Sequence, residues 1–253
     1  MLASAPSGPS LVALKHRTEV GAVPNLQADL TNLRSTMAAV RRVKPSLIVH
    51  AAYAHERAAI VDATGHLVEA ACEVGADVLV VSTDAVFAGD GTARDEESHA
   101  DPIWPYGQWK SDAERIVIDR LSEGAVVRLP LLVSIDPDDH VVRVIRASAA
   151  RGEVTRWFTD ETRQPALASE IAPAIWAIAR LASRARSGTW HLAGAERLTR
   201  FEIALRVTER LGLRRNSVQP TMTPEDALRP RHIMMTDERA RLQIGWEPSP
   251  VLT

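Results

Sequence analysis

The sequence predicts an α/β protein with a doubly wound parallel sheet and a smaller carboxyl-terminal α/β lobe. Short apolar runs in the first half are rich in β-branched residues and do not alternate with polar ones, as is typical of strands buried on both faces of a parallel sheet. Amphipathic segments separate these runs, and this alternation indicates helical crossovers. The pattern loosens after about Pro130, so we expect the main sheet in residues 1–133 and the smaller lobe in residues 134–253.

Four strands and three helices are expected in the first part. The strands are the apolar runs Leu11–Leu14, Leu47–His50, Asp77–Ser82 and Ala125–Arg128. The helices are the amphipathic segments Asn32–Val43, Glu56–Gly75 and Gly107–Leu121. Pro45 stops the first helix, and Gly75 is well placed as a carboxyl-terminal cap of the second.

The second part gives weaker strand signals. Helices are expected at His140–Ala150, Ser169–Ala182, Arg200–Leu211 and Thr236–Leu242. Short apolar segments near Val154 and at Thr189–Leu192 predict isolated strands. The stretch Asn216–Arg231 is rich in proline and polar residues, so it predicts a loop with one short helix.

The composition limits the classes of function. The 253 residues include 30 Lys and Arg against 32 Asp and Glu, so the charge balance gives no support to nucleic-acid or anionic-membrane binding. Cys72 is the only cysteine, which excludes an intramolecular disulfide and fits a reducing cytoplasm. No apolar run reaches the roughly 18 residues of a membrane span. The spacings of the histidines are irregular and predict no metal site.

The strongest chemical signal is the segment Tyr106–Lys110, which follows Pro105. Proline suits the first position of a helix, so Tyr106 and Lys110 would share one helix face. A tyrosine that acts as a general acid at neutral pH needs a pKa below its usual value of about 10. A nearby ammonium lowers that pKa because it favours the phenolate, and Lys110 is also able to bind a cofactor ribose. The alternative is an incidental pair on a surface helix.

A second signal is Ser82-Thr83-Asp84, at the end of an expected strand. Ligands of open α/β sheets bind beyond the carboxyl ends of the strands, where the Thr83 hydroxyl would meet a substrate carbonyl. The alternative is a polar strand end whose side chains satisfy backbone groups. Together with Tyr106 and Lys110 later in the chain, the functional interpretation is favoured.

Two segments, VVSTDAVFAGDG at Val80–Gly91 and DPIWPYGQWK at Asp101–Lys110, resemble the dTDP-4-dehydrorhamnose reductase-like family of extended short-chain dehydrogenases. The resemblance implies a Rossmann-like dinucleotide-binding part, residues 1–133, and a mainly substrate-binding lobe, residues 134–253. It also implies that Thr83, Tyr106 and Lys110 form the catalytic set. Tyr106 would protonate the oxygen of a ketose while a nicotinamide delivers hydride to carbon, and Thr83 would orient that carbonyl.

The resemblance extends over nearly the whole chain from about Leu11 and implies further binding residues. Those implied for the cofactor are His16, Arg17, Asp29, Leu30, Ala51, Ala52, Tyr53, Tyr106 and Lys110. Those implied for the substrate are Thr83, Asp84, Val86, Phe87 and Arg163. The Asp29-Leu30 pair resembles the family's adenine contact, and Ala51-Ala52-Tyr53 resembles the turn against the dinucleotide.

The basic run Lys15-His16-Arg17 bears on the choice of cofactor. It follows the strand Leu11–Leu14, where an acidic residue would bind the ribose of NAD. Basic residues suit a 2′-phosphate there, so the run predicts a preference for NADP(H), with NAD(H) as the other candidate. A solvated charge run is the alternative interpretation.

The sequence departs from the family at three places. It has no Gly-x-x-Gly-x-x-Gly turn near its start, and on the order of 20–25 residues are missing by comparison with a usual βαβ unit. Either the start codon has been placed too far downstream, which is favoured because the loss of a central strand would expose sheet edges, or the product is truncated. Asp62 stands where related enzymes carry an asparagine of the proton relay. Arg128–Leu131 replaces a segment that holds an aromatic residue in rhamnose-forming members.

These observations predict a cytoplasmic NAD(P)H-dependent reductase or epimerase of a nucleotide-activated keto-sugar. Its partner is then a small molecule, and a homodimer is expected because relatives form one. A second hypothesis is a non-catalytic regulatory or sugar-nucleotide-binding homologue, like the β subunit of methionine adenosyltransferase, and a third is an inactive fragment. The set Thr83, Tyr106 and Lys110 favours the enzyme, whereas the missing Gly-rich turn favours the second hypothesis.

Overall fold

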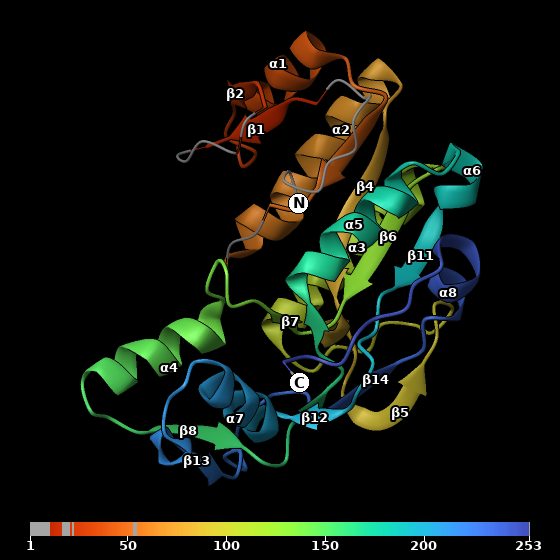
Figure 1. The fold of residues 1–253 in the computed structure, drawn as a ribbon. Coiled ribbons are helices and arrows are strands. Elements are labelled where there is room, and N and C mark those ends of the chain that lie inside the picture. Colours follow the sequence, from red (N-terminus) through yellow and green to blue (C-terminus); the bar gives the residue numbers. More distant parts are fainter. Residues whose placement is uncertain (1–10, 17–20, 22, 53–54, 253) are drawn as a thin grey trace. The chain divides into compact units, whose positions relative to one another are not determined.

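The computed structural model describes residues 11–16, 21, 23–52 and 55–252. The fold is α/β, as the sequence predicts, and the chain divides into two compact units (Figure 1). Unit 1 comprises residues 1–82, 105–128 and 172–190. Unit 2 comprises residues 83–104, 129–171 and 191–253.

Unit 1 is built on a four-stranded sheet with the order β11-β6-β4-β3. The strands are β3 (Leu47–His50), β4 (Asp77–Thr83), β6 (Ala125–Leu129) and β11 (Gly188–His191). β3 and β4 pair in parallel from Leu47 opposite Asp77 to His50 opposite Val80, and Figure 1 shows β4, β6 and β11 running in one direction. All five residues of β6 are buried, which explains why its sequence does not alternate.

A separate two-stranded parallel sheet precedes it, formed by β1 (Ala13–Lys15) and β2 (Asn25–Gln27). Leu14 of β1 and Ile48 of β3 both pack against a cluster that includes Val40 and Leu67. Within the described residues, no hydrogen-bonded pairing joins β1 to β3. The strand expected at Leu11–Leu14 is therefore present, shifted towards Lys15.

The helices of unit 1 are α1 (Leu33–Val43), the π-helix η2 (Ala58–Asp62), α2 (Ala63–Val74), α3 (Pro105–Arg120) and α6 (Ser183–Arg186), with α5 (Ala168–Ala179) shared between the units. The start of α1 and the end of α2 are marked by capping residues. Asn32 accepts a hydrogen bond from the Ser35 amide and caps α1. Gly75 ends α2 with a φ of 71°, a left-handed conformation that glycine adopts without strain.

The core of unit 1 lies between this sheet and helices α2 and α3. Valines from β4 and β6 pack there against Val68 and Val117, and each such buried side chain stabilises the fold by about 1.5–3 kcal/mol. This packing fixes α3 against the carboxyl-terminal halves of β4 and β6, which positions the side chains considered below.

Unit 2 contains a four-stranded sheet with the order β12-β9-β14-β5 and two parallel strand pairs, β10-β7 and β13-β8. The strands are β5 (Asp90–Arg94), β7 (Leu132–Val133), β8 (Thr155–Phe158), β9 (Thr162–Arg163), β10 (Ala166–Leu167), β12 (Leu198–Thr199), β13 (Val218–Thr221) and β14 (His232–Met235). Its helices are the 3-10 turns η3 (Asp84–Val86) and η4 (Arg215–Ser217) and α4 (His140–Ala150), α7 (Arg200–Arg210) and α8 (Glu238–Ile244). Its core packs Trp157, Ile203 and Val218 around Ile145.

The helices α4 and α7 confirm their predicted ranges to within a residue. The expectation of isolated strands in this half was wrong. β11 is the edge strand of the unit 1 sheet beside β6, and β8 pairs with β13 inside the stretch expected to be loop. Both strands find partners about 60 residues away along the chain, and such pairings leave no trace in a local sequence pattern.

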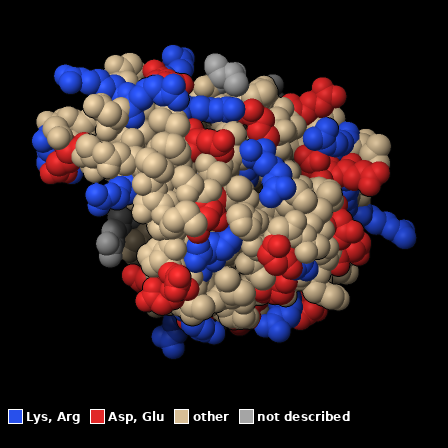
Figure 2. All heavy atoms as spheres, turned by 90° about the horizontal axis from the view of Figure 1, so that it is seen from below, with Lys and Arg blue, Asp and Glu red and all other residues tan. Residues whose placement is uncertain are grey.

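The surface agrees with the near-neutral composition. On the face shown in Figure 2, acidic and basic side chains are interspersed and form no extended single-sign area. Among the described residues, no helix is both long and apolar enough to cross a lipid bilayer.

Candidate functional site

One face of α3 holds the residues with the strongest chemical signal. Pro105 is the first residue of α3, as predicted, so Tyr106, Lys110 and Glu114 follow at intervals of four residues and share one face. Lys110 and Glu114 are both buried. Two buried charged side chains on a helix that packs against a sheet need partners, since an isolated buried charge is costly.

Lys110 is held against the carboxyl-terminal end of β4. Its side-chain Nζ donates a hydrogen bond of 3.0 Å to the carbonyl oxygen of Val81, and the residue is only 7% exposed. Burial lowers the pKa of Lys110 to about 8, while the charge of Glu114 acts in the opposite direction. The ammonium is therefore the main form at neutral pH, and it deprotonates only slightly above it.

Tyr106 lies one helical turn before Lys110. Its ring packs against the apolar cluster of Ile60, Val61 and Ala113, and it is tilted by 49° to the His55 ring at 5.1 Å between centroids. These contacts fix the ring direction, so a phenol and an ammonium are presented from consecutive turns of one rigid helix.

His50 ends β3 and is buried. Burial, and then the positive charge of Lys110, lowers the pKa of His50 to about 4. The imidazole is consequently neutral at physiological pH and can take up a hydrogen bond without adding charge beside Lys110.

Because the pKa of His50 is about 4 in the folded chain and about 6.5 when unfolded, the unfolded state binds more protons between these values. Stability should thus fall as the pH drops from about 6.5 to 4, by about 3 kcal/mol in full. In His50→Gln that part of the acid sensitivity should disappear. Urea unfolding at pH 7 and pH 4 measures the change in the free energy of unfolding, and His140→Gln, at an exposed histidine, is the control. Equal acid sensitivity in His50→Gln and wild type would refute the assignment of this effect to His50.

Behind Lys110 lies a buried cluster of three side chains, Ser82, Glu114 and Arg128. The Arg128 guanidinium donates from Nε to both Glu114 oxygens at 3.2 Å and from Nη2 to Oε2 at 2.9 Å. The Ser82 hydroxyl donates to Oε1 of Glu114. Arg128 comes from β6, Ser82 from β4 and Glu114 from α3, so the cluster ties three elements together at one carboxylate.

In unit 2, Thr83 and Asp84 form a local turn. The Thr83 hydroxyl accepts from the Ala85 amide at 3.2 Å and donates to the Asp84 carboxylate at 3.1 Å, which caps η3. Burial raises the pKa of Asp84, opposed by the charge of Arg163. Val86 and Phe87 are fully buried, so both side chains contribute to packing; their role towards substrate stays a prediction.

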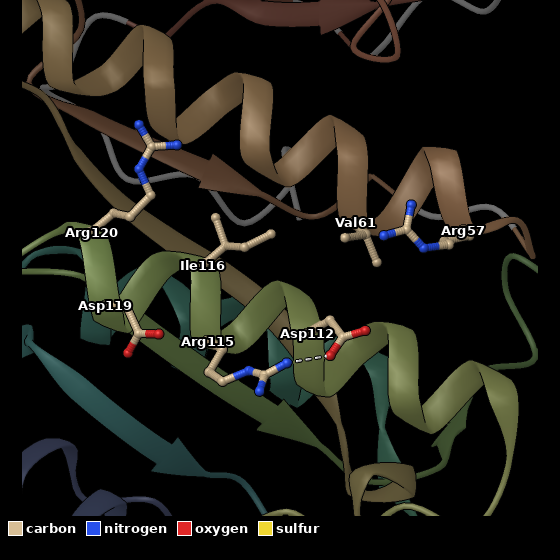
Figure 3. A pocket seen from close by; sticks show the side chains of 7 residues that line it. All are labelled: Arg57, Val61, Asp112, Arg115, Ile116, Asp119 and Arg120. Atoms are coloured by element: carbon tan, nitrogen blue, oxygen red, sulfur yellow. Dashed lines mark hydrogen bonds and ion pairs between the residues drawn. The ribbon is translucent and has the colours of Figure 1, made fainter.

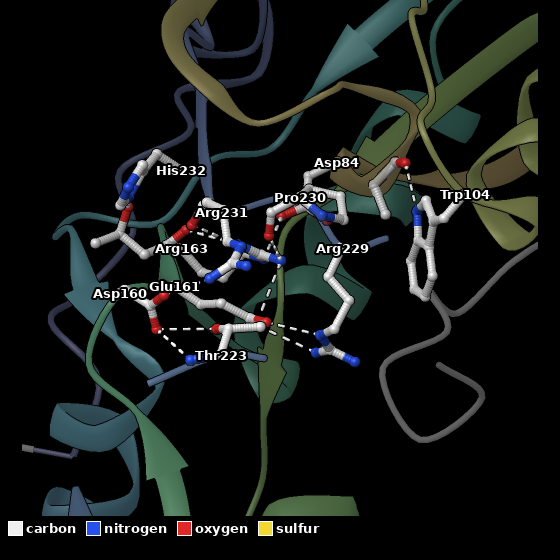
Figure 4. A network of polar contacts seen from close by, with 12 residues as sticks. Asp84, Trp104, Asp160, Glu161, Arg163, Thr223, Arg229, Pro230, Arg231 and His232 are labelled. Carbon is white, nitrogen blue, oxygen red and sulfur yellow. Dashed lines mark hydrogen bonds and ion pairs between the residues drawn. The ribbon is translucent and has the colours of Figure 1, made fainter. Parts of the chain in front are cut away.

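Arg163 belongs to a polar network in unit 2 (Figure 4). Its Nη1 and Nη2 donate to the carbonyl oxygens of Thr162, Arg231 and Pro230 at 2.8, 3.2 and 2.8 Å. Its Nε lies 4.0 Å from the Asp84 carboxylate, and the neighbouring buried Glu161 binds Arg229. The Arg163 guanidinium thus organises the backbone at 230–231, and direct substrate binding by it remains a prediction.

The residues that the sequence predicts to contact the adenine and the rest of the dinucleotide lie in unit 1, where those described make local hydrogen bonds, pack in the core or are exposed. The Asp29 carboxylate accepts from the Thr31 amide at 2.9 Å and from the Thr31 hydroxyl at 2.6 Å, and Leu30 packs in the cluster around Val40. Ala51, Ala52 and His16 are exposed. Arg17 and Tyr53 lie outside the described residues.

A family model for the RmlD substrate binding domain matches residues 4–251. The chain belongs to this family. The match confirms the resemblance indicated by the segments around Thr83 and Tyr106.

Two kinds of protein are among the relatives of this RmlD-family chain. The dTDP-4-dehydrorhamnose reductase of Streptomyces griseus is 29% identical over 238 residues, 87% of this chain and 78% of that protein. The methionine adenosyltransferase 2 subunit beta of Pongo abelii is 27% identical over 231 residues, 83% of this chain and 68% of that protein. The match to the Bos taurus subunit beta covers only 56% of its length, so the chain corresponds to part of that protein.

The fold is also that of solved structures. The crystal structure of dTDP-4-dehydrorhamnose reductase from Bacillus anthracis in complex with NADP superposes with a TM-score of 0.77. It is 21% identical, and the superposition covers 87% of this chain and 83% of that one. The RmlD-family chain therefore has the Rossmann-like architecture of extended short-chain dehydrogenases.

The donor set of the RmlD-family chain fits one end of a nicotinamide cofactor. Tyr106 and Lys110 present a hydroxyl and an ammonium on one helix face, the groups that a ribose and a reacting carbonyl require. The described residues include no glycine-rich turn for the pyrophosphate. The fit is thus with the reacting end of the cofactor.

A shallow groove of about 400 Å³ lies between η2 and α3 (Figure 3). It is lined by Arg57, Val61, Asp112, Arg115, Ile116, Asp119 and Arg120. Two of its lining residues, Val61 and Ile116, also belong to the apolar cluster against which the Tyr106 ring packs. The groove therefore borders the packing of Tyr106, and Lys110 is not among its lining residues.

Sequence reasoning missed the buried cluster behind Lys110. Glu114 is at position i+4 from Lys110, and Arg128 interrupts an otherwise apolar strand, so both charges could have been noticed as unusual in buried positions. Asp62, the other departure from the family, ends η2 and accepts from Arg57 at 2.8 Å.

Proposed function

We propose that the chain is a nicotinamide-dependent reductase or epimerase that acts on a nucleotide-activated keto-sugar. The observation that supports this most is the placement of Tyr106 and Lys110 on consecutive turns of α3, with Lys110 buried and charged. The dTDP-4-dehydrorhamnose reductases among its relatives support the substrate class, and the NADP in the Bacillus anthracis structure supports the cofactor class.

In this proposal Tyr106 is the general acid. The Lys110 ammonium favours the phenolate of Tyr106 and so makes its proton easier to give to a carbonyl oxygen. The carbonyl oxygen of Val81 accepts a hydrogen bond from the ammonium and so fixes its position. His50 is neutral, so it adds no second positive charge beside Lys110. Thr83 is assigned the role of orienting the carbonyl, on the strength of the family resemblance. A bound nicotinamide would supply the hydride.

NADP(H) is the proposed cofactor, with His16 and Arg17 as the residues that would meet a 2′-phosphate. His16 is exposed directly after β1, so it is accessible to a ligand. Fluorescence titrations with NADPH and NADH test the preference. Comparable dissociation constants would exclude it.

The reductase proposal is tested by following NADPH oxidation with a panel of dTDP- and UDP-linked 4-keto-sugars. Consumption of one NADPH per reduced sugar supports a reductase, whereas conversion of the sugar without net consumption supports an epimerase. Saturable NADPH binding without conversion of any sugar in the panel would contradict both.

A second candidate is a non-catalytic binding subunit, which the similarity to methionine adenosyltransferase 2 subunit beta favours. It predicts a stable complex with a methionine adenosyltransferase catalytic subunit, detected by size-exclusion chromatography with light scattering. Complex formation together with absence of sugar turnover would favour this candidate over the enzyme.

A further inference from the structure

Lys110 and Glu114 hold the end of β4 at two consecutive residues. Lys110 binds the backbone carbonyl of Val81, and Glu114 accepts the hydroxyl of Ser82. Since the two charged residues are one turn apart on α3, neither can shift along the strand without breaking the other contact. The position of the Lys110 ammonium is therefore coupled to the orientation of the Glu114 carboxylate.

The Glu114 carboxylate is in turn fixed from β6. Arg128 contacts both of its oxygens through Nε and Nη2, and the side chains of Arg128 and Glu114 are only 7% and 8% exposed. A two-pronged, buried guanidinium contact of this kind restricts rotation of the carboxylate. A pair of this kind is a weak source of stability by itself, which leaves room for a role beyond folding.

The charges around Lys110 show what the carboxylate does. Glu114 on α3 and His50 on β3 both interact electrostatically with Lys110, and Arg128 from β6 binds the Glu114 carboxylate. Tyr106 lies one turn earlier. Of these groups Glu114 is the one that favours the charged form of Lys110, against the effect of burial.

We propose that Glu114 is a positioning residue, whose carboxylate, oriented by Ser82 and Arg128, keeps the Lys110 ammonium charged and seated at the end of β4. The inference deepens the proposed function, since it assigns the group that maintains the charge beside Tyr106. It also concerns a property of Lys110 that exists without any substrate, so it can fail independently of that function.

Lysine NMR gives a direct test, because Lys15, Lys44 and Lys110 are the only lysines in the chain. With side-chain ¹³C-labelled lysine, Lys110→Arg identifies the Lys110 signal, and the exposed Lys44 serves as an internal reference. In Glu114→Gln the titration of Lys110 should move to lower pH by about 1 unit, a roughly tenfold change in the protonation equilibrium. The titration of Lys44 should not move.

Glu73→Gln is the matched control, since Glu73 is also bound by an arginine, Arg41, but is exposed on α2. It should leave Lys110 unchanged. If sugar turnover is observed, the alkaline limb of its pH profile should shift to lower pH in Glu114→Gln by the same amount. Glu114→Asp keeps the negative charge, so its profile should shift less than that of Glu114→Gln.

A folded Glu114→Gln variant with an unchanged Lys110 titration would overturn the inference. Should that variant fail to fold, the double variant Glu114→Gln/Arg128→Met removes both buried charges and gives the same comparison, with a smaller expected shift. Comparison of this double variant with Arg128→Met alone isolates the effect of the carboxylate, and an equal Lys110 titration in the two would likewise overturn the inference.

Discussion

Replacement of Tyr106 by phenylalanine is expected to lower turnover of the keto-sugar by about 10²–10⁴-fold, the range associated with loss of one general acid. The aromatic ring and its packing against Ile60 and Val61 are retained, so only the hydroxyl is lost. The dissociation constant for NADPH should stay close to that of the wild type. Steady-state kinetics and a fluorescence titration on the same preparation measure the two quantities.

Trp109→Phe is a suitable control for this experiment. Trp109 packs in the same apolar cluster as Tyr106 and has no assigned role in proton transfer, so its replacement should preserve turnover within a few-fold. Unchanged turnover in Tyr106→Phe would remove Tyr106 from the mechanism. A parallel loss in both variants would show that helix packing, and not the hydroxyl, limits the reaction.

Arg128→Met is expected to have the largest effect on stability. Among the described residues, it leaves the buried Glu114 carboxylate with Ser82 as its direct side-chain donor. Breaking a buried ion pair from one side costs about 3–5 kcal/mol. The free energy of unfolding in urea measures the loss. Most of it should be recovered in Glu114→Met/Arg128→Met, since apolar residues of similar volume can replace both charges.

Arg41→Met provides the comparison on the surface. The Arg41–Glu73 pair has side chains 59% and 39% exposed, and exposed pairs contribute up to about 1 kcal/mol. The expected order is therefore a small loss for Arg41→Met and a several-fold larger one for Arg128→Met. Losses of similar size would mean that the buried pair of Arg128 and Glu114 contributes no more to stability than an exposed pair.

Local patterns in the sequence predicted those features that depend on neighbours along the chain. β3 was predicted with its observed ends because the apolar run Leu47–Val49 follows Pro45-Ser46 and is closed by His50. α3 was predicted because Pro105 marks its start. The interval between Tyr106 and Lys110 was informative since the helix alone places them on one face. For Thr83, the sequence left open that its hydroxyl only satisfies backbone groups at the strand end. The hydroxyl does accept a hydrogen bond from the Ala85 amide.

Features that depend on distant partners could not be predicted. The contact between Glu114 and Arg128 needs β6 to lie beside β4, and the membership of β11 in the same sheet needs β6 as its neighbour. The sequence marks Arg128 as a charge within an apolar strand, but its partner Glu114 is identified only once these strands are placed. The sequence therefore located the phenol and the ammonium of the candidate site, and the structure added the groups behind them.

The segment order of the two units has a consequence during synthesis on the ribosome. β11, the edge strand of the unit 1 sheet, is made only after two of the three segments of unit 2 have emerged. One of those segments, residues 129–171, is made between β6 and β11, so the nascent chain must hold β6 with one side unpaired over that stretch. Such open edges invite wrong pairing. Any slowing of translation between β6 and residue 188 prolongs the exposure of β6, so the chain should depend on chaperones most strongly in that interval.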